Sequence, residues 1–448
     1  VNISDPSATD KRVNGYDNIE DFFETAITNN TYLSMSGGTD NGNYFFSVGR
    51  LSQSGIVPNT SFERVNFKIS GETKLSDKLK ISGGATYSNS KGDYAQKGSN
   101  LSAVMVGLMR CTPTFDLTNG VSNPADNPVA YMYPDGTQRN YYSKYDNPYW
   151  SVNKNRASDN VDRIIGNSQV DYTILTWLTA MYRVGVDSYS EERNAFFDNS
   201  SSDTENGYVT VSTYTFNSVN SDFLLSGEQK LSEDIKLNVS LGHNYYTKKT
   251  YNNYQQGDSL ILPDFYDISN TKTLKGDDSR TKYEIVGVFY DVKLAYKSYL
   301  YFNATGRNDW SSTLASGRNS FFYPSFSSSF IFTDAFSIEN DYFNYGKIRA
   351  SWAQVGNDAP AYSLLDYFVG IDDRINGQTA FATQRTIGNK KLKPETTRST
   401  EVGVDLRFFK NKLGVDLAYY ESKSIGQIVK VPVAYSTVYS YILSNAGL

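Results

Sequence analysis

The sequence predicts an all-β protein, a large antiparallel β-barrel that crosses a membrane. Three observations predict it: runs of ten or more residues alternate between apolar and polar side chains, the connections between these runs alternate between short and long, and the composition suits strands and turns. Aromatic residues make up 15% of the 448 residues, 36 of them Tyr, whereas there are only 12 Pro. Aromatic side chains favour strands, and Gly, Ser and Asn favour turns.

The composition also argues against several classes of protein. A formal net charge of −5 leaves no basic footprint for nucleic acid. With one Cys and one His, the chain can form neither an internal disulfide nor a Cys/His zinc site, and a Ser-His-Asp hydrolase would have to use His243. The longest apolar stretch, residues 103–109, is too short to cross a membrane as a helix. We therefore expect no enzymatic activity and no cofactor.

A motif that occurs twice, Gly-Glu-x-Lys-Leu-Ser at 71–76 and 227–232, marks the clearest strands. After the first copy, apolar side chains recur at every second position from Leu79 to Tyr87, and after the second copy they recur from Leu237 to Tyr245. Successive side chains on a strand point to opposite faces of the sheet. Each copy is therefore predicted to end one strand, turn, and begin a strand with one apolar and one polar face.

The connections between the predicted strands differ systematically in length. Short connections are expected at 74–80, 174–178, 230–236, 295–299 and 408–414, with a longer one that contains a helical turn at 332–346. Longer connections are expected at 52–62, 90–160, 188–220, 247–281, 307–320 and 355–395, and a further short one at 422–428. In consecutive antiparallel strands, alternate connections lie at opposite ends of the sheet. One end therefore carries the short connections and the other end the long ones. This asymmetry is typical of transmembrane barrels, with short periplasmic turns and long extracellular loops. A soluble propeller or a tandem sandwich, the alternatives, would not produce it.

Several stretches of the chain, in the same order, resemble the barrel of SusC/RagA-type TonB-dependent transporters. They are residues 29–88, "QKGSN" at 96–100, "YDNPYWSVN" at 145–153, "GRNDWSSTL" at 306–314, "FFYPSFSSSFIFTD" at 321–334, "KIRASWAQVGND" at 347–358 and the stretch 392–422. The resemblance implies a 22-stranded barrel in the outer membrane of a Gram-negative cell, with a plug in its lumen. It implies that residues 1–30 link a missing plug domain to the barrel, and that residues 31–448 are barrel without its last strands.

The resemblance also carries expectations about function and partners. It implies active import of oligosaccharides or oligopeptides, a SusD-like surface lipoprotein as a lid, energy from TonB through a missing N-terminal part, and a dimer of transporter–lid pairs. Two alternatives stay open: an outer-membrane adhesin or structural barrel, and a siderophore-type TonB-dependent receptor, which has no such lid. Energy-coupling residues of the family belong to the missing part, so none can be assigned here.

The candidate contact residues for substrate or lid come from the longest loop and from one strand end. The loop residues are Tyr131, Tyr133, Tyr141, Tyr142, Tyr145, Tyr149 and Trp150. Flat rings suit sugar faces or a protein partner, but the same residues could pack into a small core of the loop. In "GRNDW", strand parity places Arg307 and Asp309 on the lumen face and Trp310 on the outer face. This pair either touches substrate or plug, or simply fixes the base of the loop.

Other eye-catching residues have ordinary explanations. His243 shares the apolar face with Leu241 and Tyr245, so a position facing lipid is expected. Cys111 is expected to be a small buried residue. "TDNGN" at 39–43 forms an Asn-Gly turn rather than a calcium loop, because it lacks the EF-hand spacing. No metal site is therefore predicted.

Overall fold

A computed structural model describes residues 15–338, 340–375 and 378–447 of the chain. Its main element is one antiparallel sheet of 14 strands, each paired with its neighbours in sequence order apart from the excursion between β12 and β16. The strands are β1 (Thr28–Thr39), β2 (Gly42–Ser54), β3 (Ser61–Ser76), β4 (Leu79–Ala95), β5 (Asn155–Leu175), β6 (Leu178–Ser201), β7 (Thr204–Lys230), β8 (Ile235–Leu260), β9 (Thr271–Tyr296), β10 (Leu300–Ser311), β11 (Ser320–Ile331), β12 (Phe343–Asn357), β16 (Glu395–Phe408) and β17 (Leu413–Ile425).

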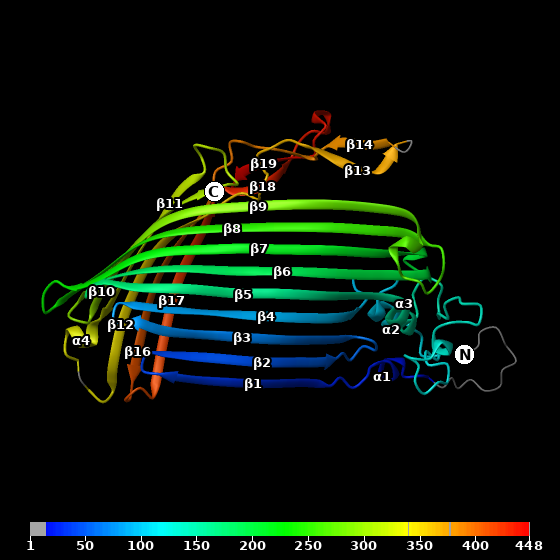
Figure 1. Ribbon diagram of the computed structural model, residues 1–448, viewed down its shortest axis with the longest axis horizontal. Helices are drawn as coiled ribbons and strands as arrows, with labels where there is room; N and C mark the ends of the chain where they lie inside the picture. The colour runs from blue at the N-terminus through cyan, green and yellow to red at the C-terminus, as the bar shows by residue number, and fades with distance from the viewer. Residues whose placement is uncertain (1–14, 339, 376–377, 448) are drawn as a thin grey trace.

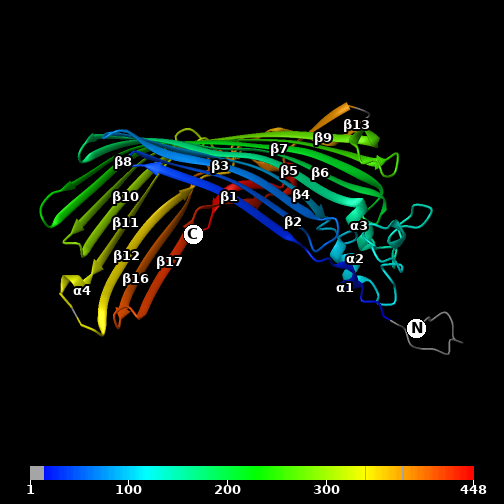
Figure 2. The same ribbon diagram turned by 60° about the horizontal axis from the view of Figure 1, so that its bottom comes forward.

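The sheet curls into an open trough. Strands β1 to β9 form one long wall, and β10, β11, β12, β16 and β17 turn away from it to form a second, steeply inclined wall (Figures 1 and 2). Strands β1 and β17 are the two edges of this sheet in the described part of the chain. An antiparallel sheet of this width that curls on itself is the architecture expected of a barrel wall. The all-β prediction is confirmed.

The register gives the sheet one apolar and one polar face. Met35 of β1 lies opposite Phe46 of β2, and Phe46 lies opposite Ile69 of β3, so these apolar side chains share a face. The same face continues through Phe326 of β11, which is 52% exposed, and Leu417 of β17, which is 62% exposed. Large apolar side chains in such an exposed row are stable against lipid rather than water. The opposite face carries the polar side chains that alternate with these apolar ones along each strand.

The short-turn end agrees with the sequence prediction. Turns of two to four residues join β3 to β4, β5 to β6, β7 to β8 and β16 to β17. The helical turn expected within 332–346 is present as α4 (Phe332–Ala335). Between β9 and β10, Lys297 and Ser298 both have positive φ, of 48° and 61°. Two consecutive residues with positive φ make the type of turn whose twist matches that of a hairpin.

At the other end, two predicted long connections are wrong. The segment 188–220 is not a loop, because β6 continues to Ser201 and β7 begins at Thr204. The segment 247–281 is mostly strand as well, and only residues 261–270 lie between β8 and β9. These strands reach 24 to 27 residues, whereas about ten are enough to cross a membrane. Their outer parts stand in water on both faces, so the apolar–polar alternation that reveals a strand is lost there.

Two small cores cover the loop end. The first contains α1 (Asn18–Phe22), α2 (Val104–Arg110), η1 (Pro128–Ala130) and α3 (Pro148–Lys154), and Phe22, Leu108 and Trp150 are buried in it. The second packs Leu314, Ala359 and Leu392 beneath the excursion, which contains the hairpin β13 (Phe368–Ile375) with β14 (Gln378–Thr383) and the short strand β15 (Thr386–Ile387). Strand β15 pairs with β19 (Tyr441–Ala446), which also pairs with β18 (Gln427–Pro432). Two further single turns are η2 (Ile268–Asn270) and η3 (Tyr435–Thr437). In the described part of the chain, no helix has the length and apolar character needed to cross a bilayer.

Candidate functional site: the lumen wall and the loop rim

The centre of the polar face is a hydrogen-bonded network that crosses four strands. Asn244 of β8 donates to the carboxylate of Asp222 at 2.7 Å, and the Arg307 guanidinium of β10 donates to the Asn244 carbonyl oxygen at 3.0 Å. Arg307 also pairs with Asp309 at 2.7 Å, and the Asp309 side chain is only 5% exposed. Tyr323 of β11 donates its hydroxyl to the same carboxylate. The prediction that Arg307 and Asp309 share the polar face is confirmed.

A glycine makes room for this network. Gly287 of β9 lies between Asn244 and Asp309 in the register. A Cβ atom at this position would come within 2.4 Å of Asp309 Oδ1 and 2.5 Å of Arg307 Nη2. Any larger residue would therefore displace the ion pair. The neighbouring strands of the wall thus hold the Arg307–Asp309 ion pair in place. This agrees with the interpretation that the pair fixes the base of the loop.

Trp310 follows Asp309 on β10 and takes the opposite face. It pairs with Val286 and Ser320 across the sheet and is 39% exposed. The outward direction expected from strand parity agrees with this register. Because Trp310 lies on the outer face, it does not point into the lumen. Its predicted contact with substrate or lid would have to be made from outside the wall.

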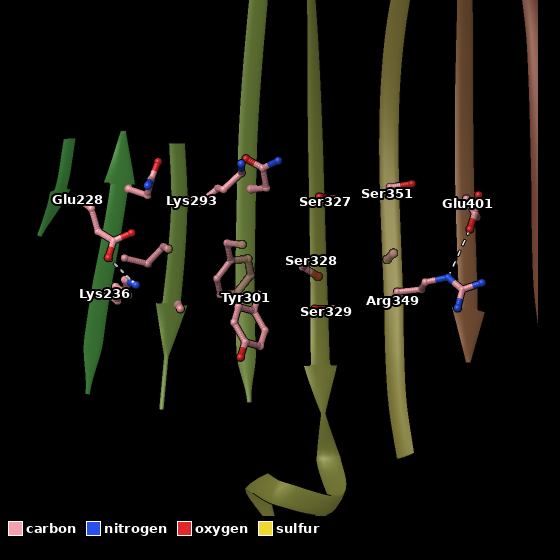
Figure 3. Close-up of a pocket in the computed structure, with 16 residues that line it drawn as sticks. Glu228, Lys236, Lys293, Tyr301, Ser327, Ser328, Ser329, Arg349, Ser351 and Glu401 are labelled. Atoms are coloured by element: carbon pink, nitrogen blue, oxygen red, sulfur yellow. Dashed lines mark hydrogen bonds and ion pairs between the residues drawn. The ribbon is translucent and has the colours of Figure 1, made fainter. Parts of the chain in front are cut away.

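Near the short-turn end, the polar face is hollowed into a groove of about 490 Å³ (Figure 3). Its floor is made of small hydroxyl side chains, Ser327, Ser329 and Ser351. Each charged side chain of its lining has a partner. Glu228 pairs with Lys236 at 2.6 Å, and Arg349 pairs with Glu401 at 3.4 Å. Lys293 pairs with Asp291, which lies next to the groove, at 3.6 Å. The groove can therefore hold polar material against the wall without favouring one sign of charge. Sequence reasoning did not identify this groove, although strand parity counted back from Arg307 places Asn303, one of its lining residues, on the same face.

Further from the membrane, aromatic rings line the same face. Tyr189 of β6 stacks on Phe216 of β7 with ring centroids 5.0 Å apart, and it lies 5.8 Å from Tyr214. Tyr246 of β8 meets Tyr283 of β9 at 6.1 Å. We call these five residues the aromatic ladder. Stacked and tilted rings with hydroxyl groups can contact both apolar and polar parts of a ligand. Sequence reasoning missed them, because it assigned most of them to loops.

Two arginines beside the aromatic ladder form bidentate ion pairs. Arg163 makes two hydrogen bonds to Asp187, at 2.9 and 2.6 Å, while its guanidinium lies over the Tyr189 ring at 5.6 Å. Arg193 makes two to Glu191, at 2.5 and 2.8 Å. Bidentate pairs of this kind hold guanidinium groups in a fixed plane. The Tyr189 end of the ladder thus lies beside guanidinium groups that are fixed in position.

The predicted loop aromatics divide into two groups, and the first group is buried. Tyr131, Tyr149 and Trp150 are 6%, 1% and 1% exposed and belong to the first loop core. The Trp150 indole donates to Ser201 Oγ at 3.0 Å, and the Tyr149 hydroxyl donates to the backbone oxygen of Asp21 at 3.0 Å. Burial raises the pKa of the Tyr149 hydroxyl well above its usual range. In this conformation these three side chains pack the loop and do not reach a ligand.

The second group lies at the loop surface. The rings of Tyr141 and Tyr145 stack with centroids 6.4 Å apart, and Tyr142 lies 5.8 Å from Tyr145. The Arg110 guanidinium covers the Tyr145 ring at 4.8 Å. Tyr133 is 46% exposed and Tyr142 is 48% exposed. We call Tyr133, Tyr141, Tyr142 and Tyr145 the rim tyrosines, because they remain accessible to a substrate or a protein partner.

His243 lies on the expected face, whereas Cys111 is less buried than the sequence predicted. His243 is exposed on the outer face, opposite Phe223 and Val288. Cys111 is half-buried at the end of α2, and burial raises the pKa of its thiol to about 11. Among the described residues, no group of three or more His, Cys, Asp or Glu side chains is placed to hold a metal ion.

An apolar outer face, a polar lumen face and an elaborate loop end define a β-barrel of the outer-membrane transport type. Comparison with known families agrees: the family model described as "TonB dependent receptor-like, beta-barrel" matches residues 112–447. The chain belongs to this family of outer-membrane barrels.

Individual relatives place the chain more closely. It is 23% identical over 440 residues to the TonB-dependent receptor P26 of Formosa agariphila, covering 93% of this chain and 42% of that protein. It is 22% identical over 438 residues to the TonB-dependent receptor SusC of Bacteroides thetaiotaomicron, covering 92% of this chain and 43% of that protein. The chain thus spans about two fifths of the length of these curated relatives. The expected resemblance to SusC is confirmed.

Solved structures show the same fold. The RagAB peptide transporter superposes with a TM-score of 0.81 at 18% identity, over 97% of this chain and 48% of that chain. The ferripyoverdine receptor of Pseudomonas aeruginosa superposes with a TM-score of 0.56 at 12% identity, over 92% of this chain and 50% of that chain. Both are barrel proteins, and the wall described above is closer in shape to the RagAB structure.

Proposed function

We propose that this chain forms part of the wall of a TonB-dependent importer that carries oligosaccharides or oligopeptides across the outer membrane. The observation that carries the proposal is the lumen face. It is polar from the groove near the short turns to the aromatic ladder, many of its charges form ion pairs, and its outer counterpart is apolar. Such a surface lets a polar oligomer pass along the wall in contact with polar side chains. Family membership and the similarity to SusC support the proposal.

The proposal includes a SusD-like lipoprotein as a lid and TonB as the source of energy. Of the rim tyrosines, Tyr133 and Tyr142 are exposed at the loop end, where a lid would sit, and aromatic residues are enriched in protein interfaces. TonB would act through a part of the protein outside this chain. The closer match to the RagAB structure than to the siderophore receptor supports a lidded importer over a siderophore receptor.

Purification of the native, full-length protein from outer membranes in mild detergent tests the proposal. Mass spectrometry should find a SusD-like lipoprotein in the same complex, together with bound glycan or peptide. Uptake of that cargo by cells should stop when TonB is deleted or a protonophore is added. A barrel that purifies alone, from cells whose nutrient uptake is unchanged by its deletion, would overturn the proposal in favour of an adhesin or structural barrel.

A further inference from the structure

A second pocket lies between the lumen wall and the loop excursion. Its volume is about 610 Å³, within the range of small-ligand sites. Lys248, Thr281 and Tyr283 contribute the wall side, from the polar faces of β8 and β9. The other side is the stretch 357–361 together with Glu395 and Ile428. This stretch reaches β9 because the backbone N–H of Lys282 donates to the Tyr362 hydroxyl at 3.1 Å.

The two carboxylates of this pocket already have neutral partners. Asp358 accepts the hydroxyl of Ser311 and lies beside the Tyr283 hydroxyl. Glu395 accepts the Asn357 amide at 3.1 Å and the backbone N–H of Ile428 at 2.6 Å. Both carboxylates are thus held by the protein at fixed positions, and neither forms an ion pair with Lys248.

Lys248 is the exception among the charged lining residues. Within the described residues its side chain makes no ion pair and no hydrogen bond, although its ammonium group lies 5.8 Å from the centre of the Tyr283 ring. Ala359, Pro360 and Ile428 supply apolar surface in the same pocket. An ammonium group next to apolar surface gains most from an oxygen ligand that also carries a negative charge.

We propose that this pocket binds a carboxylate group carried by the cargo, with Lys248 as its charged partner. Two kinds of cargo carry such a group: a peptide with a free C-terminus, and a glycan that contains a uronic acid. The aromatic face of Tyr283 and the apolar wall suit the neighbouring residue or sugar ring. This inference rests on the proposed import function and narrows the cargo to oligomers with a carboxylate.

The test uses the full-length protein, purified with any partner that accompanies it, and calorimetric titration with four probes. They are a mixture of hexapeptides with free C-termini, the same mixture with amidated C-termini, hexagalacturonate and maltohexaose. We expect one of the acidic probes to bind about tenfold or more tightly than its neutral counterpart, as a charge-assisted hydrogen bond requires. Preference for the peptide acid identifies peptide cargo, and preference for the galacturonate identifies an acidic glycan.

Two variants decide the role of Lys248. Lys248→Met should remove the preference for the acidic probe, whereas Lys249→Met should keep it, because Lys249 is exposed on the outer face of the same strand. Equal binding of acidic and neutral probes, no binding of either acidic probe, or a full preference in the folded Lys248→Met protein would overturn the inference. TonB-dependent uptake by wild-type cells separates the two proposals, because it can persist when this inference fails. A Lys248-dependent preference without such uptake would contradict the transport proposal alone.

Discussion

At the scale of single residues, the lumen wall keeps its charges in place through neighbours on adjacent strands. Asp309 is held by Arg307 and Tyr323, and Arg307 is held by Asn244. Arg307 and Asp309 lie two residues apart on β10, and Tyr323 lies opposite Arg307 on β11. Gly287, between Asn244 and Asp309 in the register, leaves the space they need. A buried carboxylate that loses its cation, or a cation that loses its carboxylate, must be desolvated without compensation.

Removal of one partner should therefore destabilise the barrel. We expect Asp309→Ala to lower the free energy of unfolding by about 2 kcal/mol or more, since Arg307 would keep a desolvated charge. Urea titration of the full-length protein in detergent, followed by loss of the heat-modifiable folded band, measures the change. Arg280→Ala is the control: Arg280 lies 3.5 Å from Asp278 in an exposed pair, which should contribute less than about 1 kcal/mol. Equal shifts in the two variants would contradict the interpretation.

The Cys111 thiol should react slowly with thiol reagents in the folded protein. Burial raises its pKa to about 11 from a usual value of 9.0, while Arg139 opposes the shift. Because the thiolate is the reactive form, its fraction at pH 8 falls about a hundredfold for a shift of about two units. Rates of maleimide labelling in detergent should rise steadily between pH 8 and 10 and should increase sharply in denaturant. Labelling at pH 8 as fast as that of a free cysteine would refute the assignment.

At the scale of elements, the first loop core behaves as a small domain on the strand ends. Trp150 lies at its centre and ties α3 to the turn between β6 and β7 through Ser201. The buried ammonium of Lys154 adds a link to Asp198 of β6 at 3.4 Å and to Asp264 of the next loop. Three connections that are far apart in the sequence are thereby joined into one unit.

Loss of the central side chain should loosen this unit without unfolding the wall. Trp150→Ala removes a fully buried ring, a change that typically costs about 3–5 kcal/mol. We expect limited proteolysis of intact cells to cleave within residues 96–154 of this variant, while the folded barrel band is retained. Tyr142→Ala, which truncates an exposed ring of the same loop, should stay as resistant as the wild type. Cleavage of both variants at the same rate would show that the core does not protect the loop.

The sequence was informative where the two faces of a strand meet different surroundings. From Leu237 to Tyr245 one face meets lipid and the other water, so the alternation was plain. Beyond Tyr189 both faces of β6 stand in water, and the predicted loop at 188–220 was wrong for this reason. The burial of Tyr149 and the exposure of Tyr142 could not be distinguished either, because both lie in the same polar, aromatic stretch. Only contacts from distant segments, such as Asp21 and Ser201, decide between them.

At the scale of the whole molecule, the sheet separates two solvents. Phe326 and Ser327 are neighbours near the middle of β11, and the register places them on opposite faces. Phe326 stacks with Trp352 on the outer face at 6.1 Å, whereas Ser327 lines the lumen groove. The same substitution at these two positions should therefore have different effects.

Phe326→Arg should reduce the amount of folded protein in the outer membrane severely, because a charge at the bilayer midplane costs about 2–4 kcal/mol. Ser327→Arg should assemble nearly as well as the wild type, since its side chain meets water in the lumen. The intensity of the heat-modifiable band in the outer-membrane fraction measures both. Equal assembly of the two variants would mean that the face assigned to lipid is not in contact with it.

The length of the strands has a consequence for how the cell surface reaches this protein. Strand β7 has 27 residues; at about 3.4 Å each and a tilt of about 45°, it rises roughly 60 Å, of which the apolar band takes about 25 Å. The loop end of the wall therefore lies tens of ångströms above the lipid headgroups. Antibodies or phage that bind the loop end need not penetrate the layer of surface lipids. We therefore expect the loop end to be the part of the sequence on which they exert the strongest selection.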